Sequence, residues 1–267
     1  CQATRDPATI TTTRCNTCGF QPSMAGEIPL FAPDYRLRFK DHSRHSVHNL
    51  IAHADSHFWM ISRRRVITDT VTGFLNNGKT FLEVGTGPGD VSRELQNRGL
   101  RITVSDIEID SLNHAASHDI SSVVQFDLYH PIYRDHFDAV GAFDVIEHLE
   151  DDSTAVKNLL DIVKPGGLVF VTVPAHNWLW NNRDRLENHK RRYSRRRLRR
   201  LFEGSGATVI NVDYIFFMIF HDFSGLFMYM CVQGETTKPG NKSYDEHAFD
   251  EQTKFLCKNK NKMETNL

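Results

Sequence analysis

The stretch from Lys79 to Asp106 constrains the fold of this chain more than any other part of the sequence. It begins with a short apolar run, Thr80 to Val84, which is too short for a helix and is stopped by glycine, as a buried strand would be. A helix follows, with Asp90 placed to cap it, and then a second strand that ends on Asp106. Between the first strand and the helix lies a tight turn of three alternate glycines, Gly85, Gly87 and Gly89. The pattern predicts an α/β fold with a mainly parallel sheet.

The glycine turn also indicates a ligand. Glycines let the backbone approach a ligand closely, and an acidic residue about 20 residues later, here Asp106, can accept hydrogen bonds from a ribose diol. The spacing is G-x-G-x-G rather than the G-x-G-x-x-G of dinucleotide sites, and Asp90 at the helix start would repel a pyrophosphate. No Gly-Lys-Ser/Thr follows, which excludes a Walker-type phosphate loop. The turn suits a nucleoside with an amino group and no phosphate, such as S-adenosylmethionine.

An ordered set of motifs resembles a known family. LEVGTGPGD at residues 82–90 and VSD at 104–106 resemble the first two motifs of class I S-adenosylmethionine-dependent methyltransferases of the small-molecule group. Further matches, up to about Tyr193, are FDVIEHLED at 143–151, KPGG at 164–167 and Val173-Pro174. The resemblance implies a Rossmann-like, doubly wound, mostly parallel seven-stranded sheet with helices on both faces. It also implies an enzyme that transfers a methyl group from S-adenosylmethionine.

The resemblance places the cofactor at the glycine turn and at the ends of the neighbouring strands. In that position Phe126 would stack near adenine and Asp127 would accept its exocyclic amino group, although Asp127 could also be a simple turn residue. The cofactor-binding residues expected are Glu83, Gly85, Thr86, Gly87, Gly89, Asp106, Ile107, Phe126, Asp127, Phe143 and Asp144.

His148 lies just beyond the strand predicted at 139–143, where open α/β sheets bind their ligands. It is the titratable group of this stretch suited to general-base work near neutral pH, and the alternative is a structural histidine. The Asn/Asp-Pro-Pro-aromatic sequence of enzymes that methylate nucleic-acid amines does not occur there. A small or lipid-like acceptor, methylated on oxygen or carbon in preference to nitrogen, is therefore expected.

Two segments supply residues for the acceptor side. In the resembling subgroup, a His-Phe-Trp segment like that at 57–59 covers the cofactor as a lid, and the alternative is an ordinary amphipathic helix of the core. The long loop over 175–193 covers the acceptor pocket in that subgroup. Asn188 stands in it where glycine is expected, which draws attention to the local turn. The candidate substrate residues are Trp59, His176, Trp180, His189, Arg192 and Tyr193.

Composition sets outer limits on these expectations. The 267 residues are enough for one α/β core with an appendage, and the formal charge of −1 does not indicate a general nucleic-acid binder. Five cysteines at uneven spacing do not form a disulfide framework, so a cytoplasmic location is expected. Cys15 and Cys18 form half of a zinc-ribbon pattern, with a metal-free tail as the equal alternative, and no metal is assigned.

The arginine-rich run from Arg191 to Arg200 is expected to form an amphipathic helix that begins near Ser194. Its basic face is either simply solvated or a contact for RNA, anionic lipid or phosphate. An RNA methyltransferase that uses this helix is therefore an alternative function. A cofactor-binding subunit without catalysis is another.

The C-terminal part contains an apolar run over 215–232, interrupted by His221 and Asp222. It is too polar at its centre for a membrane span, so a buried or interfacial helix with peripheral membrane contact is expected. The last strand of the sheet is expected at 253–258. The predicted division is an extension over 1–40, a methyltransferase domain over 41–215 and a helix with a divergent tail over 216–267.

Overall fold

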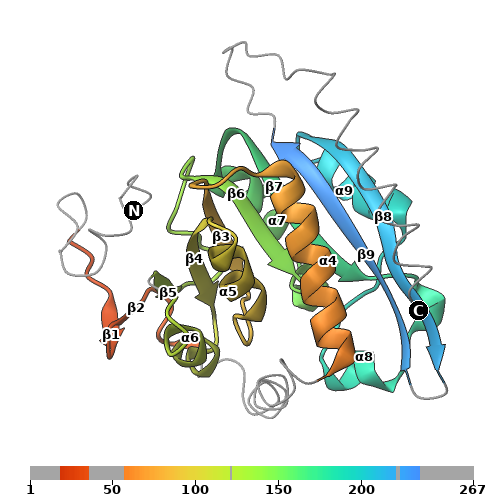
Figure 1. The fold of residues 1–267 in the computed structure, drawn as a ribbon, viewed down its shortest axis with the longest axis horizontal. Helices are drawn as coiled ribbons and strands as arrows, with labels where there is room; N and C mark the ends of the chain where they lie inside the picture. Colours follow the sequence, from red (N-terminus) through yellow and green to blue (C-terminus); the bar gives the residue numbers. More distant parts are fainter. Residues whose placement is uncertain (1–18, 36–56, 121, 221–222, 235–267) are drawn as a thin grey trace.

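The computed structural model describes residues 19–35, 57–120, 122–220 and 223–234. In this part of the chain nine strands form one sheet, in the order β1-β2-β5-β4-β3-β6-β7-β9-β8 (Figure 1). The last seven of these strands occupy the positions expected for a methyltransferase sheet. The strands are β1 Ser23–Ala25, β2 Ile28–Leu30, β3 Thr80–Val84, β4 Arg101–Asp106, β5 Val123–Gln125, β6 Phe137–Phe143, β7 Val163–Pro174, β8 Ala207–Phe220 and β9 Phe223–Gly234.

The centre of the sheet is parallel. β3 pairs with β4 on one side and with β6 on the other, so consecutive strands run outward in both directions from β3. This arrangement places the strand-order reversal between β3 and β6, and ligands of open α/β sheets bind there, beyond the carboxyl ends of the strands. β9 is antiparallel to both β7 and β8, which makes the sheet mostly rather than wholly parallel, as predicted.

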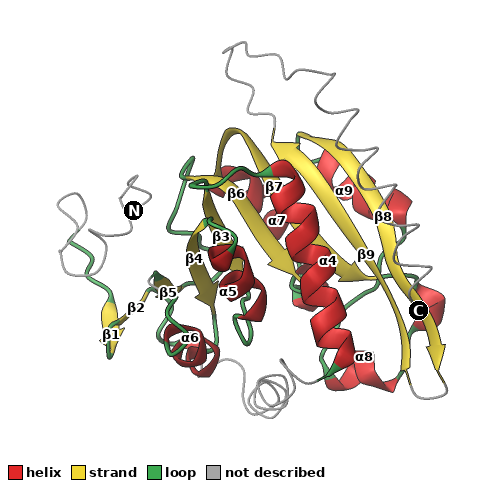
Figure 2. Cartoon of the chain, viewed as in Figure 1, coloured by secondary structure: helices red, strands yellow, loops and turns green. Residues whose placement is uncertain are grey.

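Helices cover both faces of the sheet (Figure 2). One apolar cluster joins the sheet to α4, α5 and α6 through side chains such as Val71, Leu95 and Leu112. The other joins it to α7 and α9 through Leu159 and Phe202. The helices are α4 Phe58–Phe74, α5 Asp90–Asn97, α6 Ile109–Ala116, α7 Asp152–Ile162, α8 Asn182–Leu186 and α9 Arg195–Glu203, with short 3-10 turns η1 Ile146–His148 and η2 Asn177–Leu179.

Two local predictions are wrong. The apolar run over 215–232 is not a helix, because it forms the second half of β8 and most of β9. The run is rich in the aromatic and β-branched residues that favour strands. Asp90 does not cap α5 either; Gly89 is the N-cap, and Asp90 is the first helical residue.

The position expected for the strand at 253–258 is taken by β9, and residues 253–258 themselves lie outside the described residues. The same holds for Cys15, Cys18 and the helical pattern over 41–56. The predicted domain boundaries stay a prediction. Among the described residues, no helix combines the length and the hydropathy needed to cross a membrane.

Candidate cofactor and acceptor site

The glycine turn after β3 has the backbone that its sequence requires. Gly85, Gly87 and Gly89 all have positive φ, at 70°, 54° and 77°. A Cβ on Gly85 would lie 2.5 Å from a methyl carbon of Val145, so no side chain fits there. A Cβ on Gly87 would meet nothing within 4 Å. The turn is therefore packed against the protein at its first glycine and borders open space at its second.

Asp106, at the end of β4, fastens this turn to the sheet. One carboxylate oxygen accepts the Gly87 N–H at 2.9 Å, and the other accepts the Glu108 N–H at 2.9 Å. Burial raises the pKa of Asp106 to about 6, although these N–H donors act in the opposite direction. The carboxylate lies beside the open space at Gly87, where a ribose diol could reach it.

Glu83 and Asp90 bring two further carboxylates under the turn. Glu83 accepts hydrogen bonds from the hydroxyls of Ser92 and Thr86 and is buried. Burial raises the pKa of Glu83 to about 8, and burial raises that of Asp90 as well. The Asp90 oxygen Oδ2 has no hydrogen-bond partner and lies 3.7 Å from the Arg64 guanidinium. This side of the site is acidic and only partly neutralised.

The end of β5 adds Phe126 and Asp127, and the two side chains differ. The Asp127 carboxylate accepts the Tyr129 N–H at 2.9 Å and lies 3.3 Å from a ring nitrogen of His130. Phe126 is 2% exposed and packs edge-on against Tyr133, with ring centroids 6.0 Å apart. Asp127 is thus a rim residue, whereas Phe126 belongs to the core, and this packing does not support its stacking on adenine.

Asp144, just after β6, lies at the strand-order reversal with φ of 61°. It accepts a hydrogen bond from the Thr172 hydroxyl at 2.7 Å and forms an ion pair of 2.8 Å with Arg63 of α4. Arg63 also donates to the Phe143 carbonyl at 3.2 Å. The ends of β6 and β7 and the N-terminal half of α4 therefore meet at one point beside the glycine turn.

His148 faces a second histidine across this edge. Its ring lies edge-on to that of His189, with centroids 4.7 Å apart. Burial and the nearby His189 lower the pKa of His148 to about 4, so it is neutral at physiological pH. For His189, burial is outweighed by hydrogen bonds to Glu187 and Asp184, which raise its pKa. At physiological pH His148 is therefore neutral, whereas the surroundings of His189 favour its charged form.

Glu147 lies beside this pair and is completely buried, and neither of its carboxylate oxygens has a hydrogen-bond partner. Burial, with Asp144 nearby, raises its pKa well above the usual range. Ligand atoms of Glu147, His148 and His189 all lie within 4.8 Å of one another. These three residues could hold a cation, although the sequence led us to assign no metal.

The loop between β7 and α9 is held by a buried ion pair. Asp184 is fully buried and accepts two hydrogen bonds of 2.8 Å from the Arg192 guanidinium. Tyr193 is also fully buried, and its hydroxyl donates to Asp152 at 2.9 Å. In Asn188, φ is 56°, a left-handed conformation that suits the glycine expected there and that asparagine tolerates. Arg192 and Tyr193 thus build this loop, and their contact with a substrate stays a prediction.

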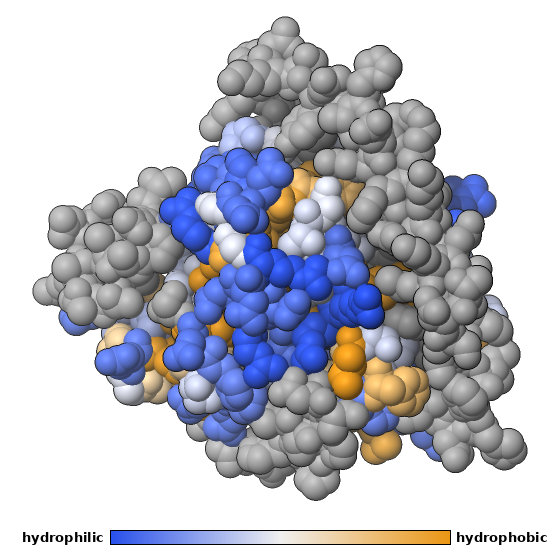
Figure 3. Space-filling view, viewed as in Figure 1, coloured by the Kyte–Doolittle hydropathy of each residue, from blue (hydrophilic) through white to orange (hydrophobic). Residues whose placement is uncertain are grey.

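The remaining candidates on the acceptor side are less closely grouped. His176 lies between Trp178 and Tyr214, with ring centroids 5.7 and 5.0 Å away. Trp180 is half-buried, and Trp59 is buried in α4, whose N-cap His57 accepts the Trp59 N–H at 3.3 Å. Trp178 and Leu186 are 70% and 74% exposed. Figure 3 shows a few apolar residues at the lower right of this face, where the start of α4 and α8 overlap in the view. Exposure therefore draws attention to Trp178 and Leu186, which the sequence did not single out.

Comparison with known proteins decides the family. The family model described as a methyltransferase domain matches residues 59–212, which span the glycine turn, the sheet and the loop. The chain belongs to the methyltransferase domain family. It has the class I fold, and members of this class use S-adenosylmethionine as the methyl donor.

Among curated relatives, this methyltransferase is similar to the ubiquinone biosynthesis O-methyltransferases of Citrobacter koseri and Escherichia coli. Each is 30% identical over 112 residues, which cover 38% of this chain and 46% or 47% of the relative. The chain thus spans about half the length of the curated relatives it matches.

Solved structures agree on the fold. A chain in the complex between the Haloferax volcanii Trm112 methyltransferase activator and a putative methyltransferase has a TM-score of 0.59 at 16% identity, covering 73% of this chain and 96% of that chain. A putative methyltransferase from Bacillus halodurans has a TM-score of 0.55 at 15% identity, covering 66% of this chain and 99% of that chain.

The residues around the glycine turn of the methyltransferase fit S-adenosylmethionine. Open space borders Gly87, a carboxylate adjoins it at Asp106, and the buried Oδ2 of Asp90 lacks a hydrogen-bond partner. Acidic groups suit an ammonium and a ribose diol, whereas they would repel a pyrophosphate. Arg63 and Asp184, which complete the ion pairs of the site, were not predicted as site residues. For Arg63, the three arginines at 63–65, next to the His-Phe-Trp segment, could have indicated such a role.

Proposed function

We propose that this methyltransferase methylates a small or lipid-like acceptor, on oxygen or carbon rather than nitrogen. S-adenosylmethionine supplies an electrophilic methyl group when bound. Asp106 would hold its ribose, Asp127 its adenine, and Asp90, whose buried Oδ2 has no hydrogen-bond partner, its ammonium, with Glu83 beside it. The remaining task of the protein is to orient the acceptor and to take a proton from it.

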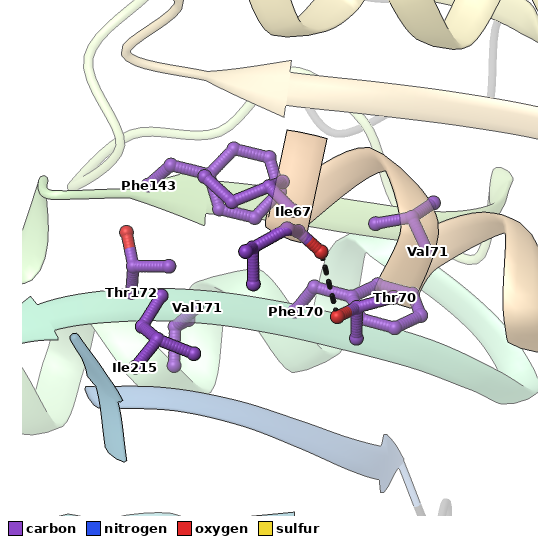
Figure 4. A pocket seen from close by; sticks show the side chains of 9 residues that line it. Ile67, Thr70, Val71, Phe143, Phe170, Val171, Thr172 and Ile215 are labelled. Carbon is purple, nitrogen blue, oxygen red and sulfur yellow. Dashed lines mark hydrogen bonds between the residues drawn. The ribbon is translucent and has the colours of Figure 1, made fainter. Parts of the chain in front are cut away.

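The observation that carries a lipid-like acceptor is an apolar hollow between α4 and the sheet (Figure 4). At rest it has room for about one water molecule, about 10 Å³, so an apolar tail could enter only if α4 moved away from the sheet. The hydroxyls of Thr70 and Thr172 in its wall are already bonded, to Val66 O at 2.8 Å and to Asp144 at 2.7 Å. The other lining side chains are apolar: Val66, Ile67, Val71, Phe143, Phe170, Val171 and Ile215.

The position of this hollow favours an acceptor with an apolar tail. Phe143 and Thr172 lie at the carboxyl ends of β6 and β7, beside Asp144. The hollow therefore lies between α4 and the strands, with Phe143 and Thr172 of its wall at the ligand-binding edge of the sheet. An acceptor could leave its reactive group at that edge while its tail enters between α4 and the sheet, provided that α4 moves to widen the space.

His148 supports an oxygen acceptor. A neutral, largely buried imidazole can accept the proton of a hydroxyl, and its low pKa keeps it unprotonated at physiological pH. The similarity to ubiquinone biosynthesis O-methyltransferases points the same way, although it covers only 38% of this chain. The cytoplasmic location is proposed with this function, whereas the peripheral membrane contact through 215–232 loses its basis, because that run lies in strands rather than in an interfacial helix.

An RNA substrate is less well supported, because the arginines of α9 and its approach are largely engaged. Arg192 is buried against Asp184, Arg191 and Arg197 lie near Asp152, Arg195 lies near Asp213, and Arg199 lies near Glu203. Arg192 is buried and cannot reach a phosphate, and RNA phosphates would have to displace the carboxylates from the other four arginines.

The test is methyl transfer from S-[methyl-³H]adenosylmethionine to three pools: polar small molecules, extracted lipids and total RNA. Label in the lipid or small-molecule pool, absent with Asp106→Ala, supports the proposal. Label in the RNA pool instead would show that the protein is an RNA methyltransferase and would refute the proposal. Binding of S-adenosylhomocysteine with no label in any pool would favour a subunit without catalysis.

The hollow has its own test, with the acceptor found in that assay. Ile215→Trp should fill the hollow and raise KM most for acceptors with the longest apolar tails. It should leave the affinity for S-adenosylhomocysteine unchanged. Ile210→Trp is the matched control, since Ile210 is half-buried on the same strand but does not line the hollow. If Ile215→Trp and Ile210→Trp change KM equally, the hollow is not part of the acceptor site.

A further inference from the structure

The N-terminal hairpin of β1 and β2 extends the methyltransferase sheet at its β5 edge. β2 is parallel to β5, with Leu30 opposite Gln125, and the chain continues along the edge through a hydrogen bond of 2.9 Å from Phe31 N–H to the Gln125 carbonyl. Figure 1 shows the hairpin at the far side of the sheet from β8. Because β5 leads directly into Phe126 and Asp127, this edge adjoins the cofactor site.

The Gln125 side chain ties three segments together at this edge. Its Oε1 accepts the Ala32 N–H at 3.0 Å, and its Nε2 donates to the Ala32 carbonyl at 2.9 Å. The same Nε2 donates to the carbonyl of Ile107 at 3.2 Å, one residue after Asp106. Gln125 is 4% exposed, so these bonds are shielded from water. The segment after β2 is thus fixed against the turn that carries Asp106.

Tyr35 is brought to the same place by a turn, in which its N–H donates to the Ala32 carbonyl at 3.2 Å. Burial, together with the nearby carboxylates of Asp127, Glu108 and Asp106, raises the pKa of Tyr35 to about 12. The phenol therefore lies within electrostatic reach of both carboxylates assigned to the adenosine, and it remains neutral.

We propose that Tyr35 is a cofactor-binding residue whose ring closes the adenosine end of the site, so that the N-terminal segment is part of the methyltransferase domain. The proposal rests on the proposed roles of Asp106 and Asp127. An aromatic ring against adenine is a common way to bind a nucleoside, and Phe126, the aromatic residue expected there, is buried against Tyr133 instead. Tyr35 comes from outside the matched family region, 59–212.

The experiment is calorimetric titration of the full chain with S-adenosylhomocysteine and, separately, with 5′-methylthioadenosine, which keeps the adenosine and lacks the amino acid. Tyr35→Ala should weaken the binding of both ligands roughly tenfold or more, which is the scale of a lost base–aromatic stack. Tyr35→Phe keeps the aromatic ring, and its affinity for both ligands should stay within about threefold of that of the unmodified chain. Phe20→Ala is the matched control, because Phe20 is an aromatic of the same N-terminal segment, stacked on Phe31 at 5.8 Å.

The outcomes separate this proposal from the one on which it rests. If Asp106→Ala abolishes binding and Tyr35→Ala binds both ligands like the unmodified chain, the cofactor site stands and the role of Tyr35 is refuted. If Asp106→Ala binds normally, the proposed cofactor site itself fails. Equal weakening by Tyr35→Ala and Phe20→Ala would reduce Tyr35 to a structural residue. Thermal unfolding without ligand shows that each variant is folded.

Discussion

Arg63 and Asp144 form a 2.8 Å ion pair between residues 81 positions apart in the chain. The arginine is 13% exposed and the aspartate 23%, so the pair is largely shielded from water. Asp144 also accepts a hydrogen bond from the Thr172 hydroxyl at 2.7 Å, and Arg63 donates one to the Phe143 carbonyl at 3.2 Å. Through these contacts α4 is fastened to the edge of the sheet at which the ligands are proposed to bind.

Replacing this arginine should therefore destabilise the fold. Arg63→Met leaves the Asp144 carboxylate without its cation, and we expect a loss of about 3 kcal/mol in the free energy of unfolding, measured with urea. Arg65→Met on the same helix is the control, since Arg65 is 76% exposed and lies 3.9 Å from Asp69, and it should cost no more than about 0.5 kcal/mol. If Arg63→Met combined with Asp144→Asn loses the full sum of the two single variants, the residues are not coupled.

The centre of the fold could be predicted from the sequence because its signals are local. The apolar run ended by Gly85 and the positive φ of the three glycines follow from short-range sterics, and the structure has both. Asp106 was identified by its position at the end of the next strand. Such features need no knowledge of distant parts of the chain.

The parts that could not be predicted depend on long-range partners. Residues 215–220 and 223–232 lie in strands because β9 pairs with β7 on one side and with β8 on the other, which hydropathy alone does not reveal. The pairing of Leu30 with Gln125 joins segments far apart in sequence, and so does that of Arg63 with Asp144. For Phe126, the position at the strand end could be predicted, but the direction in which its ring points could not.

Stability should decrease as the pH rises through the pKa of Glu83. Burial raises this pKa to about 8 from an ordinary value of 4.5, so the folded state holds the proton more tightly than the unfolded state. The resulting stabilisation is complete below about pH 4.5 and is lost as the pH passes about 8. Glu83→Gln should flatten this decline in urea unfolding at pH 5.5, 7 and 8.5. Glu94→Gln, a half-exposed site on α5, should leave it intact, and an unchanged decline in Glu83→Gln would assign it to another group.

His148 should determine the acid limit of the reaction. Because its pKa is lowered to about 4, methyl transfer should continue well below pH 6 and fall only near pH 4 to 5, with folding checked by circular dichroism. His148→Gln should reduce kcat roughly a hundredfold or more if the ring takes the acceptor's proton. His118→Gln, just beyond α6, should leave kcat unchanged.

A second variant tests the source of this shift. His189→Gln removes the neighbouring charge that contributes to the low pKa of His148, so the acid limit should move to higher pH. If the limit stays in place while His148→Gln remains inactive, His148 acts without this electrostatic help. If His148→Gln keeps full activity, the general-base assignment is wrong.

The buried pair of Asp184 and Arg192 should be essential to the loop over 175–193. The two side chains are 0% and 6% exposed and share two hydrogen bonds of 2.8 Å. Asp184→Asn keeps the shape but leaves a buried guanidinium without a counter-ion, which we expect to cost about 3–5 kcal/mol in urea unfolding. Arg185→Gln, exposed on the same short helix α8, should cost no more than about 0.5 kcal/mol.

The loss of stability in Asp184→Asn should depend on pH. Burial alone would raise the pKa of Asp184, but hydrogen bonds from Arg192, Asn181 N–H and His189 outweigh it and lower the pKa. Its contribution to stability is therefore present above the ordinary aspartate pKa of 3.8 and is lost as the pH falls through the lowered value. The deficit of Asp184→Asn should be full at pH 7 and shrink toward pH 3. A deficit that is the same at both pH values would mean that the substitution acts through packing rather than charge.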